Sequence, residues 1–468
     1  MIHRRRTKII CTIGPATADY NVLKSLSEAG MNIVRLNMSH ADQDSAKEVI
    51  NWVKTLNREV KYPIAILLDT QGPEIRTGDI PEPILLAKGE VIPIFTTKKK
   101  RKEKGVLIDY ENLSDLLEIG SRLTIDNGLI NFEITEISTD KLTGKVVDGG
   151  SLGSRKHVNL PGSRLNMPAI TPKDRDDIEF GIRHDVDFIA LSFVGAASDV
   201  EELREALGAK AKNIKIIAKI EDSLGVSNIA EIIRAADGVM VARGDLGIET
   251  AIAKLPNIQR EIVHECARSG KRSIVATHLL ESMIDNPIPT RAEVTDVANA
   301  IYEGVDGIML SGETSIGSYP VRCVKQLHEI AVQAESWPGL GYEQELIAET
   351  DKQHIATNAV ALAEDIKAAG IVVITRRGVM ADLVTNARPQ SVCIYAFTNH
   401  SQTRRRLALN RAVHSHRIAF SQEPEKTLQR ALHILLDKEG IPKGEKVVVI
   451  SDVLAGGNSD AIQLRDLG

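Results

Sequence analysis

The chain has 468 residues, of which 43% are hydrophobic and 26% charged, and these proportions exclude a disordered or fibrous protein. Its 58 basic and 63 acidic residues give a formal net charge of -5, so no positive field attracts nucleic acid, and no apolar stretch approaches the roughly 18 residues of a membrane span. The four cysteines lie far apart without a CxxC pair, which favours free thiols in a cytoplasmic protein over disulfides or a zinc site.

Eight short runs of Val, Ile and Leu recur along the chain, and segments with helical spacing lie between them. This alternation predicts an α/β fold, and eight units match a (β/α)8 or TIM barrel, whose active site lies at the carboxyl ends of the strands. A doubly wound sheet is the second interpretation. In the segment after the fourth run, Ser198 and Glu201 have the spacing of a capping box at a helix start. The eight runs are 8–13, 32–36, 65–69, 187–193, 214–220, 238–242, 273–276 and 306–310.

The regular spacing breaks after the third run, because more than 100 residues separate Asp69 from Asp187. Alternating, turn-rich pieces in this interval predict a small β domain over residues 73–167, inserted as a lid on a barrel formed by 1–72 and 168–338. We interpret its basic run as a solvated loop tip without a function. That run consists of Lys98, Lys99, Lys100, Arg101 and Lys102.

A second alternation of helices and strands follows Pro338 and a glycine-containing linker. It predicts a separate α/β domain over residues 352–468, with strands at 371–375, 391–397 and 446–450. Neither a GxGxxG fingerprint nor a GxxxxGK[ST] loop occurs, so any nucleotide must be bound by other means.

Polar side chains gather where six of the eight predicted barrel strands end. Random surface charge would not be confined to one end of each strand, whereas a barrel active site requires this arrangement. In chain order, these residues are Arg35, Asn37, Ser39 and His40, then Asp69 and Thr70, then Lys219 and Glu221, then Arg243, Gly244 and Asp245, then Thr277 and His278, and last Ser311 and Glu313.

Lys219 and Glu221 are two residues apart, so on one strand both side chains point to the same face. Alone, this pair is also typical of a salt bridge at the barrel rim. Asp245, at the end of the next strand, adds a second carboxylate, and Mg2+ typically takes one or two protein carboxylates together with substrate and water oxygens. The three residues therefore indicate a divalent metal site beside a lysine.

The other strand-end residues allow two interpretations each. Arg35 can grip a phosphate with two parallel hydrogen bonds, or it can be an ordinary surface arginine. The oxygens of Asn37, Ser39, Asp69 and Thr70 suit a weakly held hard cation, or they can serve as helix caps and turns. Thr277, Ser311 and Glu313 can form a proton relay across the barrel mouth, or a structural hydrogen-bond network. No G-x-S-x-G elbow supports serine hydrolase chemistry.

Seven motifs, in order between Thr7 and Pro320, closely resemble those of the pyruvate kinase family. The resemblance implies a TIM barrel with a β-barrel lid after strand three, a regulatory C-terminal α/β domain and a cytoplasmic homotetramer. It further implies a glycolytic enzyme that transfers the phosphoryl group of phosphoenolpyruvate to ADP, giving pyruvate and ATP. The motifs are TKIICTIGPAT, GMNIVRLNMSHA, AILLDTQGPEIRTG, KHVNLPG, IIAKIED, DGVMVARGDLGIE and RAEVTDVANAIYEGVDGIMLSGETSIGSYP.

The resemblance also implies a role for each matching residue. Glu221 and Asp245 would bind Mg2+ or Mn2+, and Lys219 would stabilise the phosphoryl group in transfer and the enolate that it leaves. Arg35 would bind the phosphate of phosphoenolpyruvate, while Gly244, Asp245 and Thr277 would bind its carboxylate. The remaining matches are a K+ site at Asn37, Ser39, Asp69 and Thr70 with Glu74 as the mark of potassium dependence, nucleotide contacts at His40, Arg76 and Lys156, and a proton route through Thr277, Ser311 and Glu313.

Five positions depart from the family's usual residues, and none of them removes a metal ligand or Lys219. Met38 stands for a common phenylalanine, Gln71 for a lysine, Asn127 for an acid, Gly195 for an arginine and His278 for a glutamine. These departures affect kinetic constants and nucleotide preference rather than the reaction. Two other functions stay open from the residues alone: another phosphoenolpyruvate or pyruvate barrel enzyme, and a catalytically silent paralogue that senses a metabolite.

The predicted C-terminal domain departs further. The family's sugar-phosphate loop has a threonine followed by Ser-Gly and another hydroxyl residue, but here Thr375 is followed by Arg376, Arg377 and Gly378. We therefore expect weak or no activation by fructose 1,6-bisphosphate. These arginines and the run 404–406 still offer charge to a nucleoside or sugar monophosphate, unless they form a solvated basic face.

Overall fold

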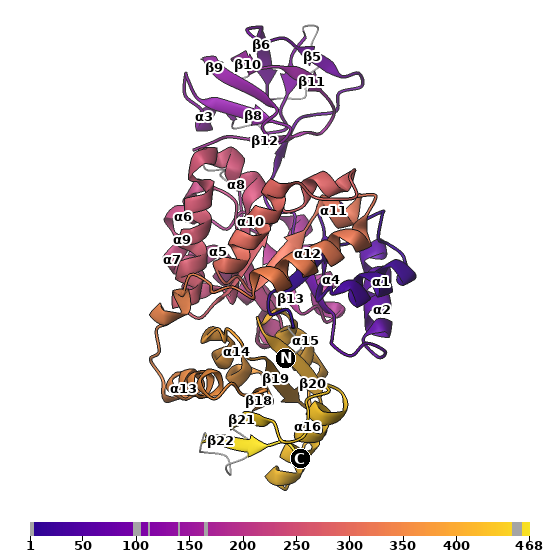
Figure 1. Cartoon of the computed structure of the whole chain (residues 1–468). Coiled ribbons are helices and arrows are strands. Elements are labelled where there is room, and N and C mark those ends of the chain that lie inside the picture. Colours follow the sequence, from indigo (N-terminus) through magenta and orange to yellow (C-terminus); the bar gives the residue numbers. More distant parts are fainter. Residues whose placement is uncertain (1–3, 97–103, 111–112, 139–140, 163–166, 452–460) are drawn as a thin grey trace.

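The computed structural model describes residues 4–96, 104–110, 113–138, 141–162, 167–451 and 461–468. Three parts of the chain are stacked, with the inserted strands at one end, the barrel in the middle and the C-terminal part at the other end (Figure 1). The basic run at 98–102 lies outside the described residues. All four cysteines carry free thiols, as the sequence predicts.

In the described part of the chain, no helix is both long and apolar enough to cross a membrane.

The central part is a closed barrel of eight parallel strands, in the order β1-β17-β16-β15-β14-β13-β3-β2. This closure confirms the TIM barrel and rules out the doubly wound sheet. Each strand falls within one residue of a predicted apolar run, apart from a two-residue shortening at the end of β13. The strands are β1 Lys8–Thr12, β2 Ile33–Asn37, β3 Ala65–Asp69, β13 Phe188–Leu191, β14 Lys215–Ile220, β15 Gly238–Ala242, β16 Arg272–Ala276 and β17 Gly307–Leu310.

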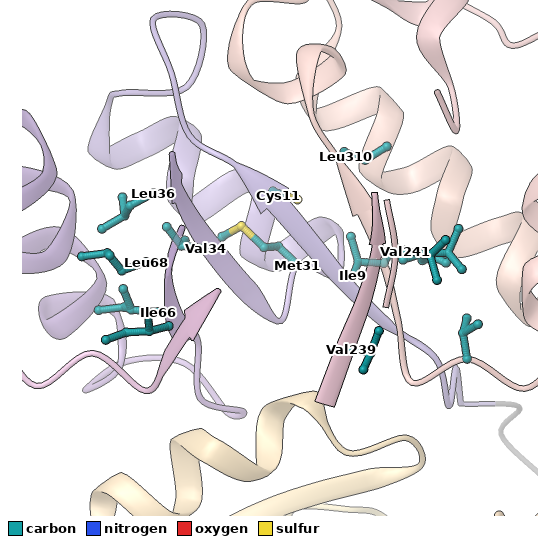
Figure 2. Close-up of a cluster of buried hydrophobic side chains, with 14 of the residues drawn as sticks. Ile9, Cys11, Met31, Val34, Leu36, Ile66, Leu68, Val239, Val241 and Leu310 are labelled. Carbon is teal, nitrogen blue, oxygen red and sulfur yellow. The ribbon is translucent and has the colours of Figure 1, made fainter. Parts of the chain in front are cut away.

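Successive residues of each barrel strand point alternately to the inside of the barrel and to the surrounding helices. Ile10, Ile33 and Ile217 belong to the interior cluster, whereas Ile9, Val34 and Ile216 pack in the outer layer. Figure 2 shows part of that outer layer, where Val34, Ile66 and Val239 lie among side chains of neighbouring strands. Both faces of the strands are therefore apolar, as the continuous aliphatic runs of the sequence require.

Helices cover the outside of the barrel. They are α1 Tyr20–Ala29, α2 Gln43–Leu56, α4 Pro172–Arg183, α5 Ala197–Leu207, α6 Ser223–Ser227, α7 Ile229–Ala235, α8 Arg243–Glu249, α9 Leu255–Arg268, α10 Arg291–Tyr302, α11 Gly312–Ser315 and α12 Pro320–Ala334. Five of them (α1, α2, α4, α6 and α10) begin with an Asp or Thr whose side chain accepts a backbone N–H of the first turn.

The predicted capping box of Ser198 and Glu201 is wrong. Helix α5 begins at Ala197, which places Ser198 inside its first turn. The Asp199 carboxylate accepts hydrogen bonds from the backbone N–H groups of Gly195 and Ala196 at 2.9 and 3.0 Å, so it fixes the helix start from inside the helix. The sequence spacing therefore located the first turn of α5 correctly but assigned the capping carboxylate to Glu201 instead of Asp199.

The inserted segment forms a curled sheet in the order β4-β12-β8-β9-β10-β6-β7, with a separate β5–β11 pair. An isolated bridge between Thr77 and Ile108 joins the two edges of the sheet, so it closes into the small barrel that the family resemblance implies. Its own apolar core includes Phe132, Ile94 and Leu123. The elements are β4 Ile75–Arg76, β5 Ile84–Leu86, β6 Val91–Phe95, β7 Val106–Leu107, α3 Leu113–Leu116, β8 Arg122–Ile125, β9 Ile130–Ser138, β10 Lys141–Asp148, β11 Gly150–Leu152 and β12 His157–Asn159.

The C-terminal part is a five-stranded sheet in the order β20-β19-β18-β21-β22, with only β22 antiparallel. Strands β20 and β22 were not predicted, because VHSHR and AIQLRD carry too many polar residues to read as buried strands. The elements are α13 Asp351–Asp365, β18 Gly370–Ile374, α14 Val379–Asn386, β19 Ile394–Thr398, α15 Ser401–Arg406, β20 Val413–Arg417, α16 Pro424–Asp437, β21 Lys446–Ser451 and β22 Ala461–Asp466.

This C-terminal part closes the floor of the barrel, the end at which the strands begin. Ala408 and Leu409 belong to the same apolar cluster as the barrel interior. Asp187 and Asp306 precede β13 and β17, and each carboxylate accepts the backbone N–H of the neighbouring strand. Arg405 and Arg388 from the C-terminal part pair with these two acids at 2.9 and 3.0 Å, so ion pairs attach this part to the floor.

Lys8 occupies the floor as well, with 3% of its surface exposed, and its Nζ donates to the carbonyl oxygen of Val413 at 2.6 Å. Burial, with a smaller contribution from Arg5, lowers the pKa of Lys8 to about 7. Between pH 7 and 9 the unfolded chain keeps this proton while the folded chain loses it, so the folded state gains stability as the pH rises.

We therefore predict that Lys8→Met abolishes this gain. Between pH 7 and 9 the free energy of unfolding of the wild type should rise by about 2 kcal/mol more than that of Lys8→Met. Urea unfolding of both proteins at the two pH values measures this change. Lys24→Met, at an exposed lysine of α1, serves as the matched control and should follow the wild type. Parallel pH dependences of the wild type and Lys8→Met would contradict the prediction.

Candidate active site

A cavity of about 340 Å³ lies between the carboxyl ends of the barrel strands and the lid. It gathers residues from β2, β14 and α8 of the barrel with residues from β4 and β12 of the lid. Most of its lining is polar or charged. The lining residues are Arg35, Asn37, Ser39, His40, Gln71, Glu74, Arg76, Asp126, Asn127, Arg155, Lys156, His157, Ser192, Phe193, Lys219, Glu221 and Asp245.

The alternation of side chains along the barrel strands explains why charged residues lie at the barrel end of this cavity. Arg35, Asp69 and Lys219 each follow an interior apolar residue by two positions, namely Ile33, Leu67 and Ile217. They therefore form the next inward-pointing layer above the apolar barrel core. Because that core offers no hydrogen bonds, the charged layer must satisfy itself.

Lys219 is the centre of this layer, and it is 8% exposed. Its Nζ lies 3.0 Å from Asp69 Oδ1, 3.0 Å from Glu221 Oε1 and 2.7 Å from Ser192 Oγ. Burial opposes the charge of Lys219, but the carboxylates of Asp69 and Glu221 outweigh it and raise the pKa of this lysine. The ammonium is consequently charged at any physiological pH and held at the cavity wall.

Asp69 is fully buried and shared between two cations. Its Oδ2 accepts from Arg35 Nε at 2.6 Å, while Oδ1 faces Lys219. Burial would raise the pKa of Asp69, but Arg35 and Lys219 together lower it. A second contact, from Arg35 Nη1 to Thr12 Oγ1 at 2.9 Å, fixes the guanidinium against β1.

Glu221 and Asp245 provide the two carboxylates that the sequence predicts for a divalent metal. Glu221 Oε2 accepts the backbone N–H of Phe193 at 2.7 Å, and the Asp245 side chain is about one-third exposed to the cavity. Burial raises the pKa of Glu221, and Asp245 and Asp69 add to this rise although Lys219 opposes it. The site therefore has more carboxylate than its own cations neutralise.

This donor set fits a hard divalent cation. Carboxylate oxygens are the ligands that Mg2+ prefers, and a surplus of buried negative charge is what such an ion would compensate. Among the described residues, no group of three or more His, Cys, Asp or Glu side chains could hold a metal. Glu221 and Asp245 would thus leave most of the coordination sphere to substrate and water.

The four residues predicted to bind K+ lie at neighbouring strand ends. Asn37 pairs with Asp69 in the β2–β3 register, and Asn37 and Ser39 line the cavity. Asp69 and Thr70 lie beneath it and are buried. Asn37, Ser39 and Thr70 offer neutral oxygens, which together with one carboxylate suit a weakly held monovalent cation.

His40, Arg76 and Lys156, the predicted nucleotide contacts, all line the cavity. The lid residues are held by acids, since Arg76 Nε donates to Glu74 Oε2 at 2.7 Å and Lys156 Nζ pairs with Asp126 at 2.9 Å. Lid and barrel meet where His157 Nδ1 lies 3.9 Å from Asp245 Oδ1. Residues from the two domains thus surround one space.

Thr277 follows β16 with a positive φ of 68°, and His278 has one of 54°. Such a backbone is strained for a threonine, by roughly 1–3 kcal/mol, and persists only when neighbours hold it. Arg243 provides this support, because its Nη2 donates to the Thr277 carbonyl at 2.6 Å. The Gly244 N–H donates to Thr277 Oγ1 at 2.8 Å, which brings together two of the predicted carboxylate-binding residues.

Ser311 and Glu313 do not line the cavity. Glu313 is fully buried, and its carboxylate accepts the backbone N–H groups of Leu280 and Ser311 at 3.0 and 2.7 Å. Ser311 Oγ is buried without a hydrogen-bond partner in the described part of the chain. No hydrogen bond between described residues joins these two side chains to Thr277, so the proton relay stays a prediction.

Sequence reasoning missed Ser192, Phe193 and Thr12 because it considered polar residues at only six strand ends. Ser192 follows β13, accepts from Lys219 and donates to the Thr70 carbonyl at 2.8 Å. Thr12 ends β1 and accepts from Arg35. The strand-end rule, applied to all eight strands, would have found Thr12 and Ser192. Phe193 acts through its backbone, with a φ of 53° that no sequence pattern here indicates.

Comparison with known proteins identifies the same family for the barrel part and for the C-terminal part of the chain. The model described as "Pyruvate kinase, barrel domain" matches residues 4–324, and "Pyruvate kinase, alpha/beta domain" matches residues 353–464. Plastidial pyruvate kinase 2 of Arabidopsis thaliana is 41% identical over 96% of this chain and 78% of its own length. Pyruvate kinase of Geobacillus stearothermophilus is 41% identical over 97% and 82%, and that of Dictyostelium discoideum is 40% identical over 99% and 94%.

Asp69 pairs with both Arg35 and Lys219, so its charge should contribute to the stability of the fold. Asp69→Asn should lower the free energy of unfolding by about 3 kcal/mol, because it leaves Arg35 and Lys219 buried beside a neutral amide. Asp245→Asn, at a partly exposed carboxylate of the same cavity, is the matched control and should cost less than about 1 kcal/mol. Urea denaturation compares the two, and equal losses would contradict the central role of Asp69.

Proposed function

Since this chain belongs to the pyruvate kinase family and is a phosphotransferase, we propose that the cavity between barrel and lid is the place where phosphoenolpyruvate gives its phosphoryl group to ADP. The observation that carries this proposal is the buried ammonium of Lys219 between Asp69 and Glu221, in the same cavity as Asp245 and Arg35. The alternatives of a different barrel enzyme or a silent paralogue gain no support from relatives that are all called pyruvate kinase.

In the proposed reaction, the bond between phosphorus and the enol oxygen of phosphoenolpyruvate breaks, and a bond to a terminal phosphate oxygen of ADP forms. ATP and the enolate of pyruvate result, and a proton added to the terminal carbon of the enolate gives pyruvate. Little covalent chemistry is left to the protein, so catalysis consists of positioning and of stabilising charge.

The ammonium of Lys219 is a fixed positive charge beside the negative charge that shifts on the substrate during the reaction. This ammonium would stabilise the phosphoryl oxygens during transfer and the enolate oxygen afterwards. Asp69, Glu221 and Ser192 hold Nζ at three points, so little reorganisation is needed when the substrate's charge develops. Arg35, anchored by Asp69 and Thr12, would bind the phosphate of phosphoenolpyruvate with its remaining N–H groups.

Glu221 and Asp245 would hold Mg2+ or Mn2+, which when bound would supply Lewis-acid stabilisation of the substrate's oxygens. Gly244, Asp245 and Thr277 would bind the carboxylate of phosphoenolpyruvate, and the Gly244 N–H would exchange its bond to Thr277 Oγ1 for one to the substrate. Asn37, Ser39, Asp69 and Thr70 would bind K+, whose positive charge would favour the bound phosphates.

The nucleotide would be bound between the barrel and the lid. His40, Arg76 and Lys156 would contact its phosphates, because cations on both walls of the cavity favour a polyanion between them. Thr277, Ser311 and Glu313 would provide the route by which the enolate is protonated. The Arg243 contact keeps the Thr277 turn in the conformation that this role requires.

The remaining parts of the proposal concern the setting of the enzyme. We propose a homotetramer acting in glycolysis, under allosteric control through the C-terminal part. Four free thiols are compatible with a reducing cytoplasm, which we propose as the location. Some relatives carry plastidial or chloroplastic in their names, and those words apply to the relatives.

A coupled assay with lactate dehydrogenase tests the reaction. With phosphoenolpyruvate, ADP, Mg2+ and K+, the wild type should form pyruvate in an ADP-dependent way, and Lys219→Met should lose roughly a thousandfold in kcat because no other cation replaces its ammonium. Lys212→Met, at an exposed lysine before the same strand, is the matched control. A rate in Lys219→Met equal to that of the wild type would overturn the assignment.

Thr277→Val separates phosphoryl transfer from protonation of the enolate. It should keep phosphoryl transfer better than it keeps the exchange of pyruvate methyl protons with solvent, because it removes a hydroxyl on the proposed proton route. NMR measures the exchange, and ATP formation measures the transfer. If Lys219→Met reduces both equally while Thr277→Val reduces neither, the proposed roles are wrong.

Glu221→Gln and Asp245→Asn test the metal site. Each removes one anionic ligand at nearly constant size, so each should raise the Mn2+ dissociation constant by roughly tenfold or more, measured directly by electron paramagnetic resonance. Glu249→Gln, on the same helix as Asp245 but outside the cavity lining, is the matched control. Unchanged Mn2+ binding in both site variants would show that the metal is bound elsewhere.

A further inference from the structure

We propose that Asp174 is a positioning residue of the reaction, which acts by fixing the pivot on which the lid turns over the active-site cavity. This inference rests on the proposed function, because it concerns how the cations of the lid reach the nucleotide. Two segments join the lid to the barrel. The chain enters the lid through residues 70–72, hereafter the entry segment, and returns to the barrel through residues 167–171, hereafter the exit segment.

Asp174 holds both of these segments. It lies in the first turn of α4 and is fully buried. Its Oδ1 accepts the backbone N–H groups of Gln71 and Gly72 at 3.0 and 3.1 Å. Its Oδ2 accepts the backbone N–H and the hydroxyl of Thr171 at 3.0 and 2.6 Å. One carboxylate therefore ties the entry segment to the exit segment.

These hydrogen bonds require a carboxylate at position 174. All the partners are donors, and only an ionised carboxylate accepts on both of its oxygens. A buried carboxylate persists because such charge-assisted bonds compensate for its loss of water. An amide would accept on one side alone and would turn its own N–H groups toward donors on the other side. Asp174→Asn would therefore keep one segment bound and release the other.

The barrel side of the pivot is firmly attached to the strand ends. The Thr70 N–H donates to the Ala190 carbonyl at 3.0 Å, and the Ser192 hydroxyl donates to the Thr70 carbonyl at 2.8 Å. In the exit segment, Ile170 is buried and packs in the outer apolar layer of the barrel. The lid can therefore turn only beyond these points of attachment.

The pivot is built against the residues that hold the charged layer of the cavity. Gly72 has a φ of 75°, and a Cβ atom there would lie 2.8 Å from Ser192 Cβ and 3.1 Å from the Phe193 ring. Ser192 Oγ accepts from Lys219, and the Phe193 N–H donates to Glu221. A fixed entry segment thus sets the position of the lid relative to the ammonium and to the proposed metal ligand.

The lid carries two of the proposed nucleotide contacts, and the pivot moves them together. Arg76 lies in β4, directly after the entry segment, and β4 pairs with β12, which Lys156 precedes. A lid held by one segment would present these cations in many positions, and ordering them on the nucleotide would cost entropy. Arg35 and Lys219, the proposed contacts of phosphoenolpyruvate, belong to the barrel and would keep their positions. Loss of the pivot should therefore affect ADP more than phosphoenolpyruvate.

Distances between two spin labels test the pivot without reference to catalysis. Lys145→Cys in the lid and Glu205→Cys on α5 provide exposed sites for labels, in a background where Cys393→Ser removes the half-buried thiol. Double electron–electron resonance should give a distance distribution roughly twofold broader or more in Asp174→Asn than in the wild type, because a lid held by one segment samples more orientations. Asp177→Asn is the matched control on the same helix, since the hydrogen-bond partners of this buried carboxylate lie outside both segments.

Thr171→Val tests the same pivot without removing a buried charge. It deletes the hydroxyl that donates to Asp174 and so loosens the exit segment alone. The distance distribution should broaden less than in Asp174→Asn, and this variant keeps the test decisive if Asp174→Asn does not fold. Thr171→Ser restores the hydroxyl and should return the width of the wild type.

The coupled assay tests the link between the pivot and the reaction. Asp174→Asn should raise the KM for ADP by roughly tenfold and the KM for phosphoenolpyruvate by less than about threefold, and Thr171→Val should show the same order with smaller effects. Asp177→Asn should leave both KM values close to those of the wild type. A merely structural role would lower kcat through the folded fraction and would not separate the two substrates.

Equal widths of the distance distribution in Asp174→Asn, Thr171→Val and the wild type would overturn the pivot, whatever reaction the enzyme catalyses. Broader distributions with an equal rise of both KM values would overturn the positioning role. A wild type that forms no pyruvate from phosphoenolpyruvate and ADP would contradict the proposed function instead, and the distances would still decide on the pivot.

Discussion

The architecture of the mouth depends on one constraint, which is that charged side chains are stacked directly on an apolar barrel core. Arg35, Asp69 and Lys219 follow interior residues by two positions and cannot turn to solvent. A buried charge without a partner costs several kcal/mol, so these residues must neutralise one another. Asp69 does so for both cations at once, with one oxygen for each, and this sharing fixes Arg35 and Lys219 relative to each other.

The same constraint determines what the mouth can bind. Lys219 and Arg35 bring two cationic groups, while Asp69, Glu221 and Asp245 bring three carboxylates; burial first, and then the carboxylates of Asp245 and Asp69, raise the pKa of Glu221. A divalent cation would compensate for these carboxylates and would also attract phosphates from the lid side. Asp69 therefore fixes Arg35 and Lys219 in place, and the carboxylates of Glu221 and Asp245 would be available to a metal.

Much of this arrangement follows from sequence, because strand alternation and the rule of the carboxyl ends are strong and local. They located the eight strands and the barrel residues Arg35, Lys219, Glu221 and Asp245 of the cavity, whereas the lid residues Arg76 and Lys156 were implied only by the family resemblance. What they could not locate depends on tertiary contacts: the left-handed turn at Thr277 held by Arg243, the Phe193 N–H on Glu221, and the polar strand β20. Asp199 took the place predicted for Glu201 because α5 begins at Ala197, so Asp199 and not Glu201 is its third residue. The closure of the lid sheet by Thr77 and Ile108 was likewise implied only by family resemblance.

Burial shifts the pKa of ionisable groups at both ends of the barrel. Burial raises the pKa of Glu221 at the mouth, whereas burial lowers the pKa of Lys271 and of Arg406 at the floor. Both directions are those in which burial disfavours the charged form of a group. At the mouth, a divalent cation held by Glu221 and Asp245 would offset this cost of burial. The mouth combines the carboxylates of Glu221 and Asp245, which would hold a metal, with cations such as Lys219, Arg76 and Lys156, which would face phosphates. The strand β14 spans the barrel, with Lys215 at the floor and Lys219 at the mouth, so one rigid element connects the end that the C-terminal part covers with the cavity at the other end.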